Sequence, residues 1–145
     1  MRKTQYSMAF LAVVAMLGAC PVPASAAGTH RHGDWPHNRS FGAVSLSDHG
    51  RPRAIVPGTT IVLTFSGHDR VSAHAGCNSA SGTGSMIAHR LVIRGLVTTR
   101  MACARARMSQ DAFLASLLTS RPRFRLTAHN LTLSHGSSQI RLVNA

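Results

Sequence analysis

Ala75-Gly76-Cys77-Asn78 and the later stretch Thr99-Arg100-Met101-Ala102-Cys103 dominate the interpretation of this 145-residue chain. They contain two of its three cysteines, and the third, Cys20, lies at the end of an N-terminal apolar segment. In an oxidising compartment such a pair favours a disulfide. Closing a loop of about 26 residues would stabilise a small domain by about 3–4 kcal/mol in the chain-entropy model.

Two other interpretations of these cysteines remain open from the sequence. They can be two buried thiols if their Cα atoms lie too far apart. They can also belong to a zinc site, although neither a C-x-x-C motif nor a tight His pair supports one. That zinc site would consist of His74, Cys77, His89 and Cys103.

Short alternating segments on both sides of the cysteines indicate strands. Before the helix they cover residues 41–47, 60–66, 70–74 and 91–97, with turns at 48–52 and 57–58 and a Gly/Ser/Thr loop at 78–85. One helix is expected after Cys103, capped by Ser109 and ended by Pro122, with an apolar stripe of Phe113, Leu114, Leu117 and Leu118. Three further strands follow at 123–127, 130–134 and 139–143. This order predicts a mainly β (α+β) domain, a small antiparallel barrel-like curled sheet with one helix near the C-terminal third.

The N-terminus has the features of an export signal. A basic start, Met1-Arg2-Lys3, precedes an apolar run from Met8 to Ala19 that is too short to span a membrane. Cleavage after Ala26 would remove a signal peptide of residues 1–26, whereas lipidation of Cys20 would remove residues 1–19. Both outcomes place the protein in the periplasm or cell envelope, soluble or lipid-anchored. Residues 27–40 then form a His-rich flexible linker, and residues 41–145 form the folded domain.

The exported part is strongly basic. Without Arg2 and Lys3 it contains 14 Arg and four Asp, a net charge of +10, and it has no Glu. Such a surface attracts anionic envelope components, and nucleic acid is not expected as a partner of an exported protein. The scattered acids form no carboxylate pair, and no Ser/His/Asp order, phosphate loop or H-E-x-x-H motif is present, so we do not expect an enzyme.

Two clusters are candidate binding sites. His30, His32 and His37 could hold Cu or Ni. The most specific form of this site requires cleavage after Ala27, which makes Gly28-Thr29-His30 the new N-terminus, so that its amine, two amide nitrogens and the His30 imidazole can enclose the metal in a square plane. Arg121, Arg123 and Arg125 alternate and would share one face of a strand, where they could bind phosphate groups.

From about residue 41 to 143 the chain resembles the META domain, the HslJ-like family of envelope proteins. The resemblance rests on the strand 57–65, the Gly-Cys-Asn signature, the second Cys motif and the helix with Phe113-Leu114-Ala115-Ser116-Leu117-Leu118. A tryptophan often starts the first strand of the family; Phe41 is expected to replace it here, since Trp35 lies earlier, and Ala73 replaces a usual glycine.

The resemblance implies a compact β domain and a family linked to heat shock and novobiocin tolerance, without established enzymatic activity. The signature positions in this chain are Gly76, Asn78, Thr99, Arg100 and Met101. We expect Gly76 to allow an unusual backbone angle or close packing, Asn78 to bond local backbone groups, and Arg100 to hold a backbone carbonyl. The expected protein is a monomer that supports envelope integrity by binding a protein or an anionic envelope component.

Overall fold

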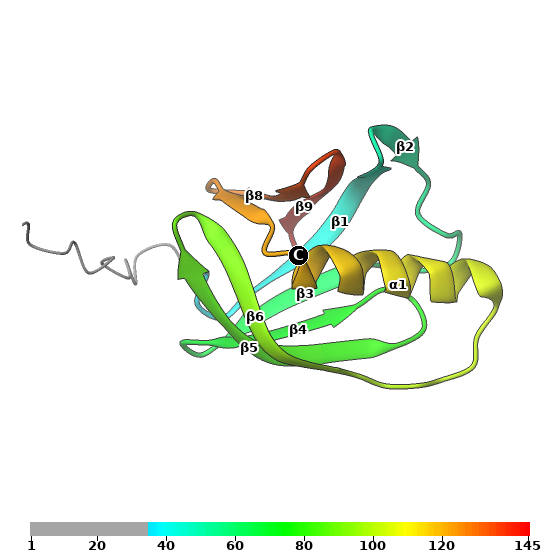
Figure 1. Ribbon diagram of the computed structural model, residues 1–145, viewed down its shortest axis with the longest axis horizontal. Helices are drawn as coiled ribbons and strands as arrows, with labels where there is room; N and C mark the ends of the chain where they lie inside the picture. Colours follow the sequence, from blue (N-terminus) through cyan, green and yellow to red (C-terminus); the bar gives the residue numbers. More distant parts are fainter. Residues whose placement is uncertain (1–34) are drawn as a thin grey trace, which may run out of the picture.

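The computed structural model describes residues 35–145, which form nine strands and one helix (Figure 1). The elements are, in chain order, β1 (Arg39–Asp48), β2 (Arg51–Arg53), β3 (Val62–Ser66), β4 (Arg70–His74), β5 (Ser79–Ile87), β6 (Arg90–Thr98), α1 (Arg105–Thr119), β7 (Arg123–Leu126), β8 (Asn130–His135) and β9 (Ser138–Asn144).

The strands form a closed antiparallel barrel. Strands β3 to β9 follow β1 in sequence order around the sheet, and β9 pairs with β1 to complete eight barrel strands. The remaining strand, β2, folds back on the end of β1 through a tight turn at His49 and Gly50, where both residues have positive φ (48° and 77°). The predicted mainly β, barrel-like fold with one helix is therefore confirmed.

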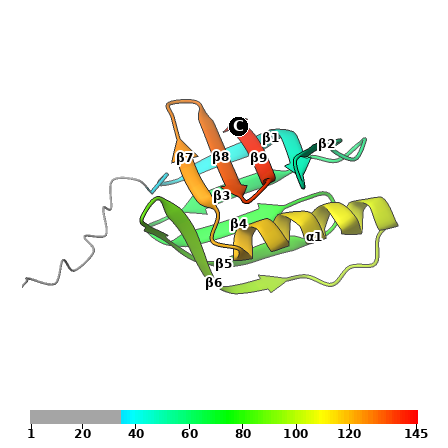
Figure 2. The same ribbon diagram turned by 45° about the horizontal axis from the view of Figure 1, so that its top comes forward.

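Aromatic side chains fill the barrel core. Phe65 on β3 is fully buried and makes edge-to-face contacts with Trp35, Phe41 and Phe124, at ring-centroid distances of 5.2, 6.0 and 5.9 Å. The predicted apolar stripe of α1 is buried in the same core, since the helix lies between β6 and the β7–β9 meander (Figure 2). Within residues 35–145 no helix is long and apolar enough to cross a membrane.

The folded part begins earlier than the predicted boundary at Phe41. Trp35 is only 6% exposed and its indole N–H donates to the Gly67 carbonyl (3.1 Å). Its ring lies so close to Gly84 that a Cβ there would come within 2.8 Å of the indole. The predicted linker of residues 27–40 thus overlaps the fold from residue 35 onward, and its earlier part lies outside the described residues.

The prediction of a loop at 78–85 is wrong, because most of this segment belongs to strand β5. Its Gly and Ser residues have weak strand propensity, but β5 pairs with β4 on one side and β6 on the other. The small residues are needed there, since a Cβ on Gly82 would lie 2.8 Å from Ile93, besides the contact of Gly84 with Trp35. Tertiary packing therefore overrides local preference in this segment.

The helix also begins one turn earlier than predicted. Its N-cap is Ala104, without a side-chain cap, and Ser109 lies inside the helix, where its hydroxyl accepts a hydrogen bond from Arg53 (2.8 Å). The residues ahead of Ser109 include Ala, Arg and Met, which favour helix and extend it. The helix ends at Thr119, before Pro122, which cannot continue a helix, and Arg121 between them adopts φ 55°.

Candidate functional site

Cys77 and Cys103 form a disulfide. Their Cα atoms are 6.1 Å apart across a sequence separation of 26, which is ordinary disulfide geometry. The bond joins the start of β5 to the segment that leads into α1. The two-thiol and zinc interpretations of these cysteines are therefore wrong, because neither sulfur is a free thiolate.

Asn78 was expected to bond local backbone groups, but its side chain instead connects three segments that are distant in sequence. Its side-chain Nδ2 and its backbone N–H both donate to Asp111 Oδ2 on α1 (3.0 and 2.8 Å). Its Oδ1 accepts from the Thr99 hydroxyl (3.0 Å) and from the Met101 backbone N–H (2.7 Å). Asn78 therefore positions the second Cys motif relative to the first, across 21 to 33 residues of chain.

The other signature residues differ in what they do. Gly76 has φ 103°, and a Cβ there would lie 2.7 Å from Thr59, so the expected close packing is confirmed. Arg100 is exposed, and within residues 35–145 its guanidinium makes no hydrogen bond or ion pair, so the expected carbonyl contact is not formed.

Gln110 is the residue of this cluster that sequence reasoning missed. It is fully buried, and its Nε2 donates to the Ala75 carbonyl (2.6 Å) and to the Thr59 hydroxyl (2.9 Å). Its Oε1 accepts from the Val56 N–H (2.8 Å). The available signal was its helical phase, because Gln110 precedes Leu114 by four residues and Leu117 by seven on the buried stripe.

The three candidate anion-binding arginines do not share one strand face. Arg123 and Arg125 are exposed and lie on the same face of β7, on either side of the buried Phe124. Arg121 precedes the strand, with φ 55°, because β7 begins only at Arg123. The expected row of three is therefore reduced to two.

Two adjoining grooves lie at the boundary between β6 and β7. The larger, about 700 Å³, is lined by Arg123 and Arg125 together with the apolar side chains of Met86, Phe124 and Leu126. The second, about 540 Å³, contains Arg90, Arg94 and Arg121. Ala88 lines both, and no acidic residue of the described chain lines either one.

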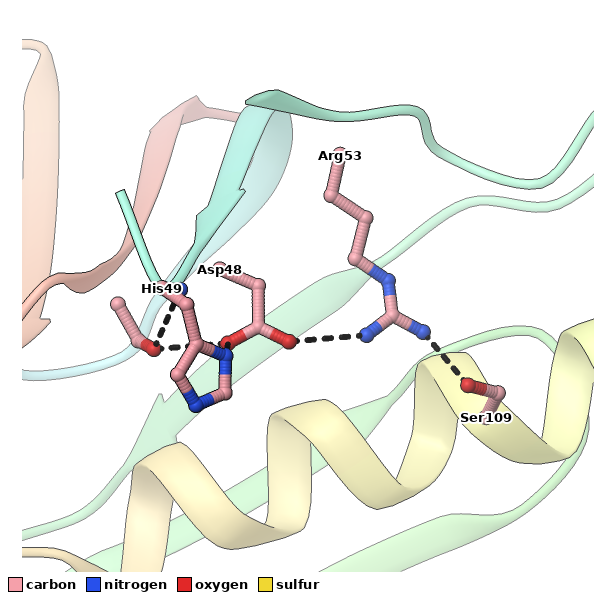
Figure 3. Close-up of polar contacts among 5 residues, drawn as sticks. Asp48, His49, Arg53 and Ser109 are labelled. Carbon is pink, nitrogen blue, oxygen red and sulfur yellow. Dashed lines mark hydrogen bonds and ion pairs between the residues drawn. The ribbon is translucent and has the colours of Figure 1, made fainter. Parts of the chain in front are cut away.

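A separate polar network joins β1, β2, β9 and α1 (Figure 3). Asp48 Oδ1 accepts from the Ser138 hydroxyl (2.9 Å) and contacts His49 Nδ1 (3.0 Å), while Oδ2 lies 3.5 Å from Arg53. Arg53 in turn donates to Ser109. Ser138 and His49 both bind the carboxylate, so this is not the serine–imidazole–carboxylate relay of a hydrolase; the network anchors the β1–β2 turn to the helix.

The proposed His arm is described only at His37. Its Nδ1 lies 3.0 Å from the Gly67 carbonyl, and its ring packs edge-to-face against His68 at 5.3 Å. His30 and His32, like the lipidation candidate Cys20, lie outside the described residues. Among residues 35–145 no three His, Cys, Asp or Glu side chains gather in a way that could hold a metal ion.

Comparisons with known proteins agree with this architecture. A solved NMR structure of a protein from Burkholderia xenovorans superimposes with a TM-score of 0.63 at 23% identity, covering 75% of this chain and 83% of that one. A second NMR structure gives a TM-score of 0.57 at 26% identity, covering 73% and 88%. No curated protein matches the chain. The model of the META domain family matches residues 34–145, and the chain therefore belongs to the META domain family.

Proposed function

We propose that this META-domain protein is a non-enzymatic, exported component of the cell envelope. It acts by binding an anionic envelope component and supports envelope integrity under stress or antibiotic exposure. Export rests on the basic and apolar N-terminal segment of residues 1–26, with Cys20 as an alternative lipid anchor.

The unbalanced positive charge of the folded domain carries this proposal. Residues 35–145 contain thirteen Arg and three Asp. Among them only Arg53 has a carboxylate partner, Asp48, and that ion pair belongs to the network of Figure 3. The remaining arginines are uncompensated within the described chain, and their common sign attracts polyanionic surfaces.

The first test uses lipid vesicles. The mature protein is expected to co-sediment with vesicles containing phosphatidylglycerol, and to leave them when salt rises from about 0.1 M to 1 M, since screening shortens electrostatic attraction. Vesicles of pure phosphatidylcholine serve as the uncharged control. Equal sedimentation with both lipids, or binding that salt does not weaken, would contradict the proposal.

A copper- or nickel-binding role for the His arm is a second proposal. It is favoured by the His37 contact: a ring that donates its Nδ1–H to a backbone carbonyl presents Nε2 to a metal, as ligating histidines commonly do. His30 and His32 would supply further imidazoles, and a free Gly28 amine would add a nitrogen ligand.

Calorimetric titration of copper into the mature protein tests this role. Replacing His30, His32 and His37 together by Gln is expected to weaken Cu(II) binding at least about tenfold, one unit of log affinity. Substitution is preferable to deleting the arm, because a deletion reaching His37 would remove the core residue Trp35. Replacing the exposed His129 by Gln is the control, and equal binding by all three proteins would dismiss the idea.

A further inference from the structure

Two arginines face each other across the boundary between β6 and β7. Arg90 and Arg123 are the one register pair that joins these strands in the described chain. The flanking bonds run from Leu91 N–H to the Pro122 carbonyl (3.0 Å) and from Phe124 N–H to the His89 carbonyl (2.8 Å). This pattern makes Arg90–Arg123 a non-hydrogen-bonded pair, the kind whose side chains approach most closely.

Such a pair is unfavourable without a counter-ion. Like charges directly opposite one another destabilise an antiparallel pair, and no acidic side chain of residues 35–145 lines the adjoining grooves. Arg90 is also held in place, since its Nη1 donates to the Arg121 carbonyl (3.0 Å). The two arginines therefore start from directly opposite backbone positions, Arg90 lining the smaller groove and Arg123 the larger, and no acidic residue of the described chain lines either groove.

Residues with positive φ lie along the same two grooves. Ala88 and His89, which connect β5 to β6, have φ 48° and 58°, and Arg121 has φ 55°. Five non-glycine residues in the described chain have positive φ, and these three line the two grooves. Ala88 and His89 are the two central residues of the β5–β6 hairpin, where a two-residue turn requires positive φ at both positions, so this turn fixes the rim that the two grooves share.

The larger groove places apolar and cationic surfaces side by side. Phe124 and Leu126 alternate along β7 with Arg123 and Arg125, so the inward apolar residues and the outward arginines lie on opposite faces of one strand. β6 and β7 are joined at one register pair, so most of β7 is not covered by β6. The groove beside β7 is therefore lined both by its arginines and by its apolar side chains, and Met86 of β5 lines it as well.

We propose that this groove and the Arg90–Arg123 pair bind an anionic amphiphile with a phosphate headgroup and one alkyl chain. The two guanidinium groups hold the phosphate, which each can contact with two parallel N–H bonds, and Arg125 provides a further contact. The alkyl chain lies along Met86 and Leu126. This site rests on the proposed function, because it identifies which anionic envelope component the domain recognises and where.

Titration calorimetry with dodecyl phosphate below its critical micelle concentration tests the site. The mature protein is expected to bind it at least about tenfold more tightly than inorganic phosphate, which lacks the chain, and than dodecyl maltoside, which lacks the charge. Arg123→Gln is expected to weaken dodecyl phosphate binding about tenfold or more. Arg141→Gln is the matched control, because it makes the same charge change on an exposed residue of β9 that lines neither groove. It is expected to change the affinity by no more than about twofold. Met86→Ser is expected to weaken dodecyl phosphate binding but not inorganic phosphate binding.

A stability measurement separates binding from folding. Without ligand, Arg123→Gln is expected to melt at or above the wild-type temperature, because it removes the like-charge pair. Equal weakening by Arg123→Gln and Arg141→Gln would overturn the site while leaving attraction to anionic vesicles intact. Inorganic phosphate binding as tightly as dodecyl phosphate would overturn the amphiphile. If the wild type bound neither dodecyl phosphate nor anionic vesicles, the proposed function itself would be wrong.

Discussion

A Cys77→Ala variant is expected to be less stable than the wild type by about 3–4 kcal/mol, the chain entropy restored by opening a loop of this size. For a domain of about one hundred residues that loss lowers the melting temperature by more than about 10 °C. The effect is large because the domain is small, so that this loss is a sizeable share of its free energy of unfolding. Thermal unfolding followed by circular dichroism under oxidising conditions measures it.

Three controls show whether the bond itself is responsible. Cys103→Ala should reproduce the loss, and the double variant should be no less stable than either single one, since each breaks the same bond. Treatment with a reductant should lower the melting temperature of the wild type but not that of the variants. An unchanged melting temperature for Cys77→Ala would mean that the disulfide does not constrain the domain.

Elements that follow a simple hydrophobic period could be predicted from the sequence. The alternation in β3, β4 and β7–β9 and the stripe of α1 gave the barrel and its helix, because each element buries one face in the same core. β5 could not be found this way. Its strand state depends on neighbours on both sides, and its glycines are explained only once Trp35 and Ile93 are seen against them.

The candidate sites also differ in whether a local sequence pattern could predict them. The disulfide was predicted from two cysteines in a chain whose N-terminus has the features of an export signal. The Arg90–Arg123 pair, in contrast, joins residues 33 positions apart that no local pattern connects. The expected arginine row counted Arg121 as part of a strand, because the left-handed turn before Pro122 interrupts the alternation without a glycine to mark it. Register, which decides what faces what, depends on the whole sheet.

Gln110→Leu is expected to destabilise the domain by about 3–5 kcal/mol. Leucine is similar in size to glutamine but cannot form its hydrogen bonds, so the partner groups are left without a hydrogen bond. The Val56 N–H loses its acceptor and the Ala75 carbonyl loses its donor, and each unsatisfied group costs about 1–3 kcal/mol. Urea unfolding measures the change. Gln139→Leu, a half-buried Gln on β9 whose side chain makes no hydrogen bond within residues 35–145, should change stability by no more than about 0.5 kcal/mol.

The four residues 75–78 link the barrel to the helix through contacts that include Gln110. Each of them is held by a different partner: Ala75 by Gln110, Gly76 by close packing on Thr59, Cys77 by Cys103, and Asn78 by Asp111. Because these contacts fix one rigid segment, Gln110→Leu and Cys77→Ala should not be additive, and the double variant should lose less than the two losses together. Strict additivity would mean that the disulfide and the helix stabilise the barrel independently. A smaller combined loss would identify residues 75–78 as a single clamp between barrel and helix, which is a structural reason for the Gly-Cys-Asn signature.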